Sequence, residues 1–200
     1  MPVWGWILIV LALLALAAAA FLRYRKSQSL KKRFGPEYDR VVQQSGSRRD
    51  AEKELSGREQ RREQLNIRPL DPAARDRYTE RWRKVQADFV DSPATAVTEA
   101  DALVTEVMRE RGYPMDDFEQ RSADVSVDHP QVVESYREAH RLGQLSARGE
   151  ASTDDLRQAI RQYRRLFEEL VEASADEPIE RERETASQKS SATDQERTRR

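Results

Sequence analysis

Residues 71–89 read DPAARDRYTERWRKVQADF, and this stretch predicts an α-helix with one buried face. Asp71 followed by Pro72 is a typical helix start. Proline has no backbone N–H, and in the first turn of a helix that N–H would have no partner within the helix. The apolar residues then recur every three to four positions, the period of a helix that packs on a core: Ala74, Tyr78, Trp82, Val85 and Phe89. If neighbouring stretches repeat this pattern, the chain forms a helical bundle.

Three further stretches do repeat it. One begins at Ser92-Pro93 and ends before Gly112, and its stripe is Val97, Ala100, Leu103, Val104, Val107 and Met108. Another opens at Asp128, His129 and Pro130 and carries Val133, Tyr136, His140 and Leu145. The third has a capping-box-like start at Ser152 and Asp155, and its stripe is Leu156, Ile160, Tyr163, Phe167 and Leu170. The spacing of this last stripe fits a coiled-coil seam as well as a bundle face.

The fold class expected from these stripes is all-α, with one small helical bundle over residues 70–172. About a hundred residues can bury one modest core rather than two. Residues 112–130 read as an irregular connection in which Val125 and Val127 alternate briefly with polar residues. From residue 173 to 200 only Ile179 is a large apolar residue, so this tail is expected to be disordered.

Residues 23–69 precede the bundle and are rich in charge. Gly35-Pro36 predicts a junction followed by a short helix over 36–44. A nearly all-charged helix is expected over 48–66, with Ser47 as its cap and Ala51 and Leu55 among its few apolar residues. Such a helix is more often a solvated spacer, or a helix that lies across a partner, than a core element.

Residues 1–22 predict a transmembrane anchor. No charged residue occurs between Val3 and Leu22, and twenty residues of helix cover roughly the 30 Å of a bilayer core. Trp4 and Trp6 lie at the start of this stretch and Tyr24 follows its end, as in aromatic belts. A cleaved signal peptide is the competing interpretation, but the chain begins without a basic segment and the apolar run is long.

Six basic residues follow the apolar run directly, and no acidic residue occurs before Glu37. By the positive-inside rule the protein is expected in the cell membrane as a single-pass protein, its N-terminus outside and its C-terminal domain in the cytoplasm. The same residues could contact anionic lipid headgroups, although a pure topology signal explains them equally well. They are Arg23, Arg25, Lys26, Lys31, Lys32 and Arg33.

Composition excludes several classes of function. The net charge is −1, and outside the basic cluster acidic residues outnumber basic ones, which argues against a nucleic-acid-binding domain. Because the chain has no cysteine, disulfides and thiol catalysis are excluded. The histidines, His129 and His140, lack the i, i+4 spacing of a helical metal site, and the scattered glycines form no phosphate loop. We therefore expect no cofactor, no metal and no enzymatic activity.

The segment from Gly112 to Pro130 is the best candidate for a ligand or partner contact, since loops on a rigid scaffold carry much of binding function. The alternative is a capped and packed connector. The candidate residues are Tyr113, Asp116, Asp117, Phe118, Arg121 and His129.

Four short stretches carry a resemblance to a known family: RFGPEYD (33–39), ERGYP (110–114), DFEQR (117–121) and DHP (128–130). With these motifs the chain resembles an uncharacterised bacterial family of small, single-pass, membrane-anchored helical proteins that has no assigned activity. The resemblance implies the architecture and carries over no catalytic residue.

The leading hypothesis from the sequence is a membrane-tethered helical module that binds another protein. A small-molecule sensor or enzyme with a pocket around residues 113–130 is the alternative. Homo-oligomerisation is left open by the sequence.

Overall fold

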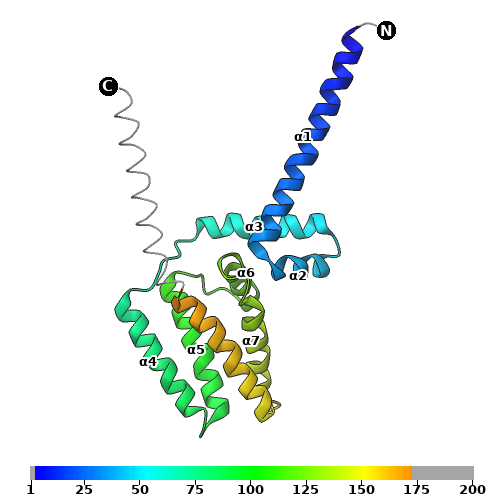
Figure 1. The fold of residues 1–200 in the computed structure, drawn as a ribbon. Helices are drawn as coiled ribbons and strands as arrows, with labels where there is room; N and C mark the ends of the chain where they lie inside the picture. The colour runs from blue at the N-terminus through cyan, green and yellow to red at the C-terminus, as the bar shows by residue number, and fades with distance from the viewer. Residues whose placement is uncertain (1–2, 173–200) are drawn as a thin grey trace, which may run out of the picture.

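The computed structural model describes residues 3–172, with the side chains at 3, 5–10, 15 and 19 excepted, and the described chain is all-α (Figure 1). The expected disordered tail, residues 173–200, lies outside the described residues. An unlabelled helix covers residues 153–172. The labelled helices are α1 (Val3–Phe34), α2 (Pro36–Ser45), α3 (Arg48–Gln64), α4 (Pro72–Asp88), α5 (Pro93–Arg111), α6 (Phe118–Asp128) and α7 (Val133–Ala147).

Helices α4, α5 and α7 and the 153–172 helix pack into the bundle that the sequence predicts. In its centre the Trp82 ring stacks on Phe167, with ring centroids 4.8 Å apart and an interplanar angle of 15°. Ile160, Tyr163 and Leu170 are buried in the same core, so the stripe of the last helix forms a bundle face rather than the seam of a separate coiled coil.

The predicted caps at Ser47, Asp71 and Ser152 form as side-chain hydrogen bonds. Ser92 precedes α5 without such a bond, and Asp128 ends α6 instead of opening the next helix, which begins at Val133. The backbone N–H of Ala74 donates to Asp71 over 2.8 Å at the start of α4. Before the last helix, the N–H of Ser152 donates to the Asp155 carboxylate over 2.9 Å, and the N–H of Asp155 donates to Ser152 Oγ over 3.2 Å. These reciprocal bonds are a capping box, because each satisfies an N–H that the helix itself leaves open.

The prediction of an irregular connection over residues 112–130 is wrong for its second half, because helix α6 runs from Phe118 to Asp128. The Asp117 side chain caps this helix by accepting from the N–H of Gln120 over 2.8 Å. Its buried face contains Ser122, Asp124 and Ser126 beside Val125 and Val127. Buried polar residues hide the apolar period of a helix, so the sequence gives a loop-like pattern here.

The interpretation of residues 48–66 as a solvated spacer is also corrected. Helix α3 packs against the end of α1, against α2 and against α6. Together they enclose a second apolar cluster that consists of Leu30, Phe34, Tyr38, Val41, Ala51, Leu55 and Val127. Because Val127 belongs to α6, the N-terminal helices are joined to the bundle through this cluster.

A sharp corner separates α1 from α2 at Gly35. Its φ of +48° and ψ of −122° lie in a region that residues with a Cβ rarely adopt. Pro36 follows as the first residue of α2 and disfavours a helical conformation at the residue before it. The pair therefore ends α1 at Phe34, and α1 projects away from the rest of the molecule (Figure 1).

The predicted transmembrane anchor at residues 1–22 requires a correction. In the part of the chain that the structure describes, no helix is both long enough and apolar enough to cross a membrane. The described side chains between residues 11 and 22 of α1 are all apolar, and Arg23, Arg25 and Lys26 continue the same helix. This finding contradicts the expected single-pass localisation, with the N-terminus outside and the C-terminal domain in the cytoplasm.

Candidate functional site

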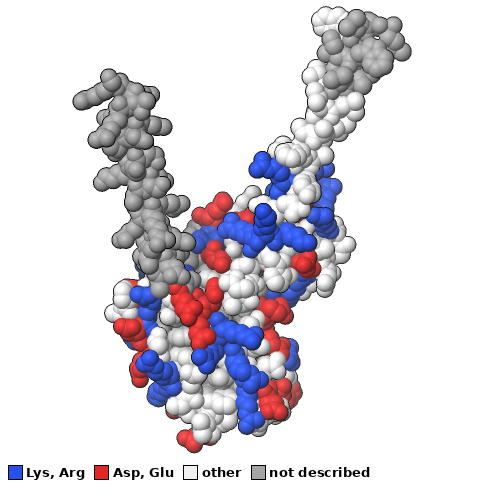
Figure 2. All heavy atoms as spheres, in the orientation of Figure 1, with Lys and Arg blue, Asp and Glu red and all other residues white. Residues whose placement is uncertain are grey.

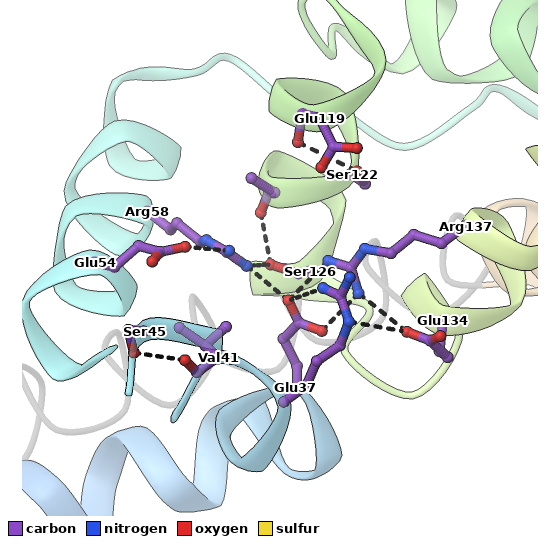
Figure 3. Close-up of polar contacts among 12 residues, drawn as sticks. Glu37, Val41, Ser45, Glu54, Arg58, Glu119, Ser122, Ser126, Glu134 and Arg137 are labelled. Carbon is purple, nitrogen blue, oxygen red and sulfur yellow. Dashed lines mark hydrogen bonds and ion pairs between the residues drawn. The ribbon is translucent and has the colours of Figure 1, made fainter. Parts of the chain in front are cut away.

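A buried carboxylate, Glu37, lies where the N-terminal helices meet the bundle (Figure 3). Its side chain is 1% exposed. Arg137 of α7 binds it through both terminal nitrogens: Nη1 donates to Oε2 over 2.7 Å, and Nη2 donates to Oε1 over 2.8 Å. Arg58 of α3 donates to Oε1 over 2.8 Å, and Arg40 of α2 forms a longer ion pair of 3.7 Å. Three helices are thus connected through one carboxylate.

The surroundings of Glu37 are balanced in charge. Arg58 also bonds to Glu54 over 2.5 Å and to Ser126 Oγ of α6 over 3.0 Å. Glu134 lies 3.3 Å from both Arg40 and Arg137. Burial by itself would raise the pKa of Glu37, but its hydrogen bonds to Arg137 and Arg58 outweigh that effect and lower the pKa below its ordinary value. We name Glu37, Arg40, Arg58, Glu134 and Arg137 the Glu37 junction.

A row of ion pairs extends the junction along α3 and α6. Arg61 Nε donates to Asp124 over 2.9 Å, and its Nη2 donates to Asp116 over 2.5 Å. Arg62, the next residue of α3, bonds to Asp128, which lies one turn after Asp124 in α6. We call the pairs of Arg61 and Arg62 with these aspartates the α3–α6 ladder. Asp124 is 1% exposed, so this contact is more than a solvated surface pair.

The predicted contact residues do not converge on one site. Asp116 and Asp117 each make a contact that stabilises the fold. Asp116 belongs to the ladder, and Asp117 caps α6. Beside them a cavity of about 500 Å³ opens between α3 and α6. Its lining includes Asp117, Glu119 and Gln120 from one side and Glu54, Arg58 and Arg61 from the other.

Tyr113 and His129 are buried near the end of α5. The Tyr113 hydroxyl donates to Asp128 over 3.3 Å, and burial raises its pKa. Arg111 Nη1 lies 3.3 Å from His129 Nε2, while His129 Nδ1 lies 2.9 Å from Glu169. Burial lowers the pKa of His129, although Glu169 acts in the opposite direction. A neutral ring that donates from Nδ1 to Glu169 and accepts at Nε2 from Arg111 satisfies these contacts.

Phe118 and Arg121 belong to a third group, on the face of α6 that meets α7. The Phe118 ring stacks on His140 with centroids 3.7 Å apart. Arg121 Nε donates to the Tyr136 hydroxyl over 3.1 Å, and burial raises the pKa of Tyr136 to about 12. The six predicted residues thus fall into three separate groups. Their contacts join neighbouring helices or cap a helix.

The predicted headgroup-contact residues line the second half of α1, and all six are exposed. Arg33 lies 3.4 Å from Glu59 of α3. A role in headgroup contact stays a prediction. Within residues 3–172, no group of three or more His, Asp or Glu side chains could hold a metal ion.

Sequence reasoning missed the members of the Glu37 junction. In the sequence, Glu37 follows Pro36 in the first turn of a predicted helix, where an acidic residue is common. Arg58 and Arg137 are two of many arginines in charged helical stretches. Glu37 is 21 residues from Arg58 and 100 from Arg137 along the chain. No local pattern joins such distant residues. No protein-family model, curated protein or solved structure matches the chain, and the family resemblance stays a prediction.

Proposed function

We propose that this protein is a helical protein-binding module whose contact element is the projecting part of α1. The observation that carries the proposal is a group of large apolar side chains on α1 that touch little of the remaining molecule. Leu11, Leu13, Leu14, Leu16, Phe21 and Leu22 are each between 57% and 67% exposed. Outside α1, Val90 is the only comparable exposed side chain of the described residues.

These residues do not form a single stripe. Leu11, Leu14, Phe21 and Leu22 share one side of a helix, whereas Leu13 and Leu16 lie on the opposite side. A helix that is apolar on all sides is normally enclosed, and a continuous exposed apolar surface indicates a contact with another molecule. The partner therefore surrounds this part of α1 with more than one element, as a groove between helices does.

Charge indicates the kind of partner. The apolar part of α1 is followed by Arg23, Arg25 and Lys26. In a parallel pair of two α1 helices, these cations would face their own copies, and like charges at close range cost free energy. A partner with acidic residues beside its apolar groove gains attraction at the same place. We therefore assign the contact to a different protein with such a groove.

The Glu37 junction supports this role, since it fixes the base of α1 relative to the bundle. Glu37 follows the corner at Gly35 by two residues and is held by Arg58 and Arg137. An arm with a fixed direction loses less conformational freedom on binding than a hinged arm would.

Site-specific photo-crosslinking in cells, with the full chain, tests the proposal. A photoreactive residue at Leu14 should yield a discrete adduct, while one at the exposed Glu80 of α4 should not. The crosslinked peptide of the partner should come from an apolar groove with acidic neighbours. Replacing Arg23 and Arg25 by Glu should reduce the adduct several-fold. Adducts with lipid only, adducts with a second copy of this chain, or no discrete adduct would overturn the proposal.

The alternative, a small-molecule sensor or enzyme around residues 113–130, has one observation in its favour: the cavity of about 500 Å³ between α3 and α6. A ligand of this cavity would raise the melting temperature of the full chain by mass action. Replacing Gln120 by Ala at the cavity wall should remove that increase. A metabolite and metal panel that leaves the melting temperature unchanged would dismiss this alternative.

A further inference from the structure

A second cavity, of about 490 Å³, lies between α1 and α3 at the base of the projecting arm. Arg23 and Lys26 line it from α1, and Arg48 and Arg49 line it from the first turn of α3. Figure 2 shows Lys and Arg side chains gathered where α1 meets the body of the molecule. We call this cavity the basic groove. Its size lies within the range of ordinary small-ligand sites.

The groove has an excess of positive charge that its own residues do not neutralise. Glu52 is the one carboxylate among its lining residues, and Arg48 binds it over 3.1 Å. Within the described residues, Arg23, Lys26 and Arg49 have no carboxylate at ion-pair distance, in contrast to most arginines of α3. Three cations therefore face the groove without a counter-charge.

A fixed set of hydrogen bonds forms the inner wall of the groove. Arg48 Nη2 donates to the buried Ser27 Oγ over 2.5 Å, and Arg48 Nε donates to Tyr38 Oη over 3.0 Å. The Tyr38 hydroxyl donates to Glu52 over 3.0 Å. Burial opposes ionisation of Glu52, but hydrogen bonds from Ser27, Tyr38 and Arg48 lower its pKa. The Glu52 carboxylate is therefore occupied within the wall and does not compete for the three open cations.

We propose that the basic groove binds a phosphate monoester dianion. Guanidinium groups bind phosphate through paired, charge-assisted hydrogen bonds, and an ammonium adds a further charge. The cations of the groove come from one short stretch of α1 and from the first turn of α3, in a chain of net charge −1. This distribution fits one small anion better than the extended backbone of a nucleic acid.

The same chemistry is offered by a soluble phosphate monoester and by the headgroup of phosphatidic acid, so the experiment has two arms. In the first, glycerol phosphate is titrated into the full chain by calorimetry. In the second, the full chain is added to phosphatidylcholine vesicles with and without phosphatidic acid. Both arms compare the wild type with R23Q/R49Q and with a matched control, K31Q/K32Q. The control removes the same charge from exposed residues of α1 that do not line the groove.

The wild type should bind glycerol phosphate, or should bind vesicles in a manner that requires phosphatidic acid. Whichever arm responds identifies the source of the phosphate. R23Q/R49Q should weaken that binding about tenfold or more, because hydrogen bonds between charged groups are strong. K31Q/K32Q should change the affinity less than about twofold, because charges that do not line the groove act on the anion only through screened solvent. The inference fails if neither probe binds, if R23Q/R49Q binds as the wild type does, or if both double variants weaken binding equally.

Discussion

Trp82 shows what a single residue contributes to the bundle. Its ring is 4% exposed and stacks on Phe167. Its Nε1, however, is buried without a hydrogen-bond partner among the described residues. The residue therefore combines a large apolar contribution with one unsatisfied donor.

Replacing Trp82 by Ala should lower the free energy of unfolding by about 3–5 kcal/mol, because a large cavity is left in the core. Trp82→Phe should cost clearly less, since it keeps an aromatic ring opposite Phe167 and removes the unsatisfied donor. Denaturant unfolding followed by circular dichroism measures both. A cost below about 1 kcal/mol for Trp82→Ala would contradict the buried position.

At the Glu37 junction a single residue contributes to stability through its charge rather than through apolar burial. Glu37→Gln leaves Arg58 and Arg137 near a neutral amide, so the free energy of unfolding at neutral pH should fall by about 3 kcal/mol or more. Asp39→Asn is the matched control in the same helical turn, because Asp39 is exposed and should change stability by less than about 0.5 kcal/mol. Equal effects of the two substitutions would contradict the buried ion pair.

The pH dependence of Glu37 has a definite sign. Its pKa is lower in the folded chain than the ordinary value of 4.5, so folding favours the ionised form. The stability it contributes is complete above the unfolded pKa and is lost as the pH falls through the folded pKa. The difference in unfolding free energy between wild type and Glu37→Gln should therefore shrink as the pH falls below about 4.5. A difference that grows on acidification would contradict the assignment.

At the scale of elements, α3 is held in two different ways along its length. Its first half buries Ala51 and Leu55 in the second apolar cluster, which α3 encloses with the end of α1, α2 and α6. Its second half contacts α6 through the α3–α6 ladder, where Arg61 and Arg62 meet aspartates. Salt weakens charge pairs much more than it weakens apolar contacts.

Raising the salt concentration from about 0.05 M to about 1 M should therefore speed amide hydrogen exchange over residues 58–64 more than over residues 51–55. Residues 100–108 of α5 provide an internal reference, because Leu103, Val104 and Val107 of this stretch are buried in the bundle core. Arg61→Gln should produce the same local acceleration without added salt. A uniform response along α3 would show that the ladder does not hold its second half.

Regular apolar stripes can be predicted from the sequence, whereas contacts between buried polar residues cannot. The stripes of α4, α5, α7 and the last helix were predicted because a regular apolar period is a local signal. Helix α6 was missed because Ser122, Asp124 and Ser126 occupy its buried face. The docking of α3 was missed because its second half binds through arginines, which sequence patterns normally assign to solvent. The Glu37 junction joins residues too distant in sequence for any local pattern to reveal.

At the scale of the whole molecule, the bundle begins before residue 70, the boundary expected from the sequence. Ile67 is buried in the bundle core, and the N–H of Arg68 donates to the carbonyl of Arg111 over 2.8 Å. Gly112 has a φ of +95°, and a Cβ at this position would lie 2.4 Å from the carbonyl oxygen of Asn66. The segment at 66–68 is therefore fitted closely against the end of α5.

A fragment of residues 66–172 should fold alone and be more stable than a fragment of residues 70–172. Burial of Ile67 and the Arg68 hydrogen bond should together account for about 2–4 kcal/mol. Denaturant midpoints of the two fragments measure the difference. Equal midpoints would show that the 66–69 segment does not belong to the bundle.

The corner at Gly35 also has a mechanical meaning, because α1 acts as a lever with its fulcrum at that residue. A helix of 32 residues is about 48 Å long at 1.5 Å per residue. A tilt of only ~10° at the fulcrum would move its far end by about 8 Å, more than one helical turn. The contacts that Arg58 and Arg137 make with Glu37 lie next to this fulcrum, where the smallest displacement is amplified most. A small shift of the three side chains at this junction would therefore become a much larger displacement at the tip of the lever.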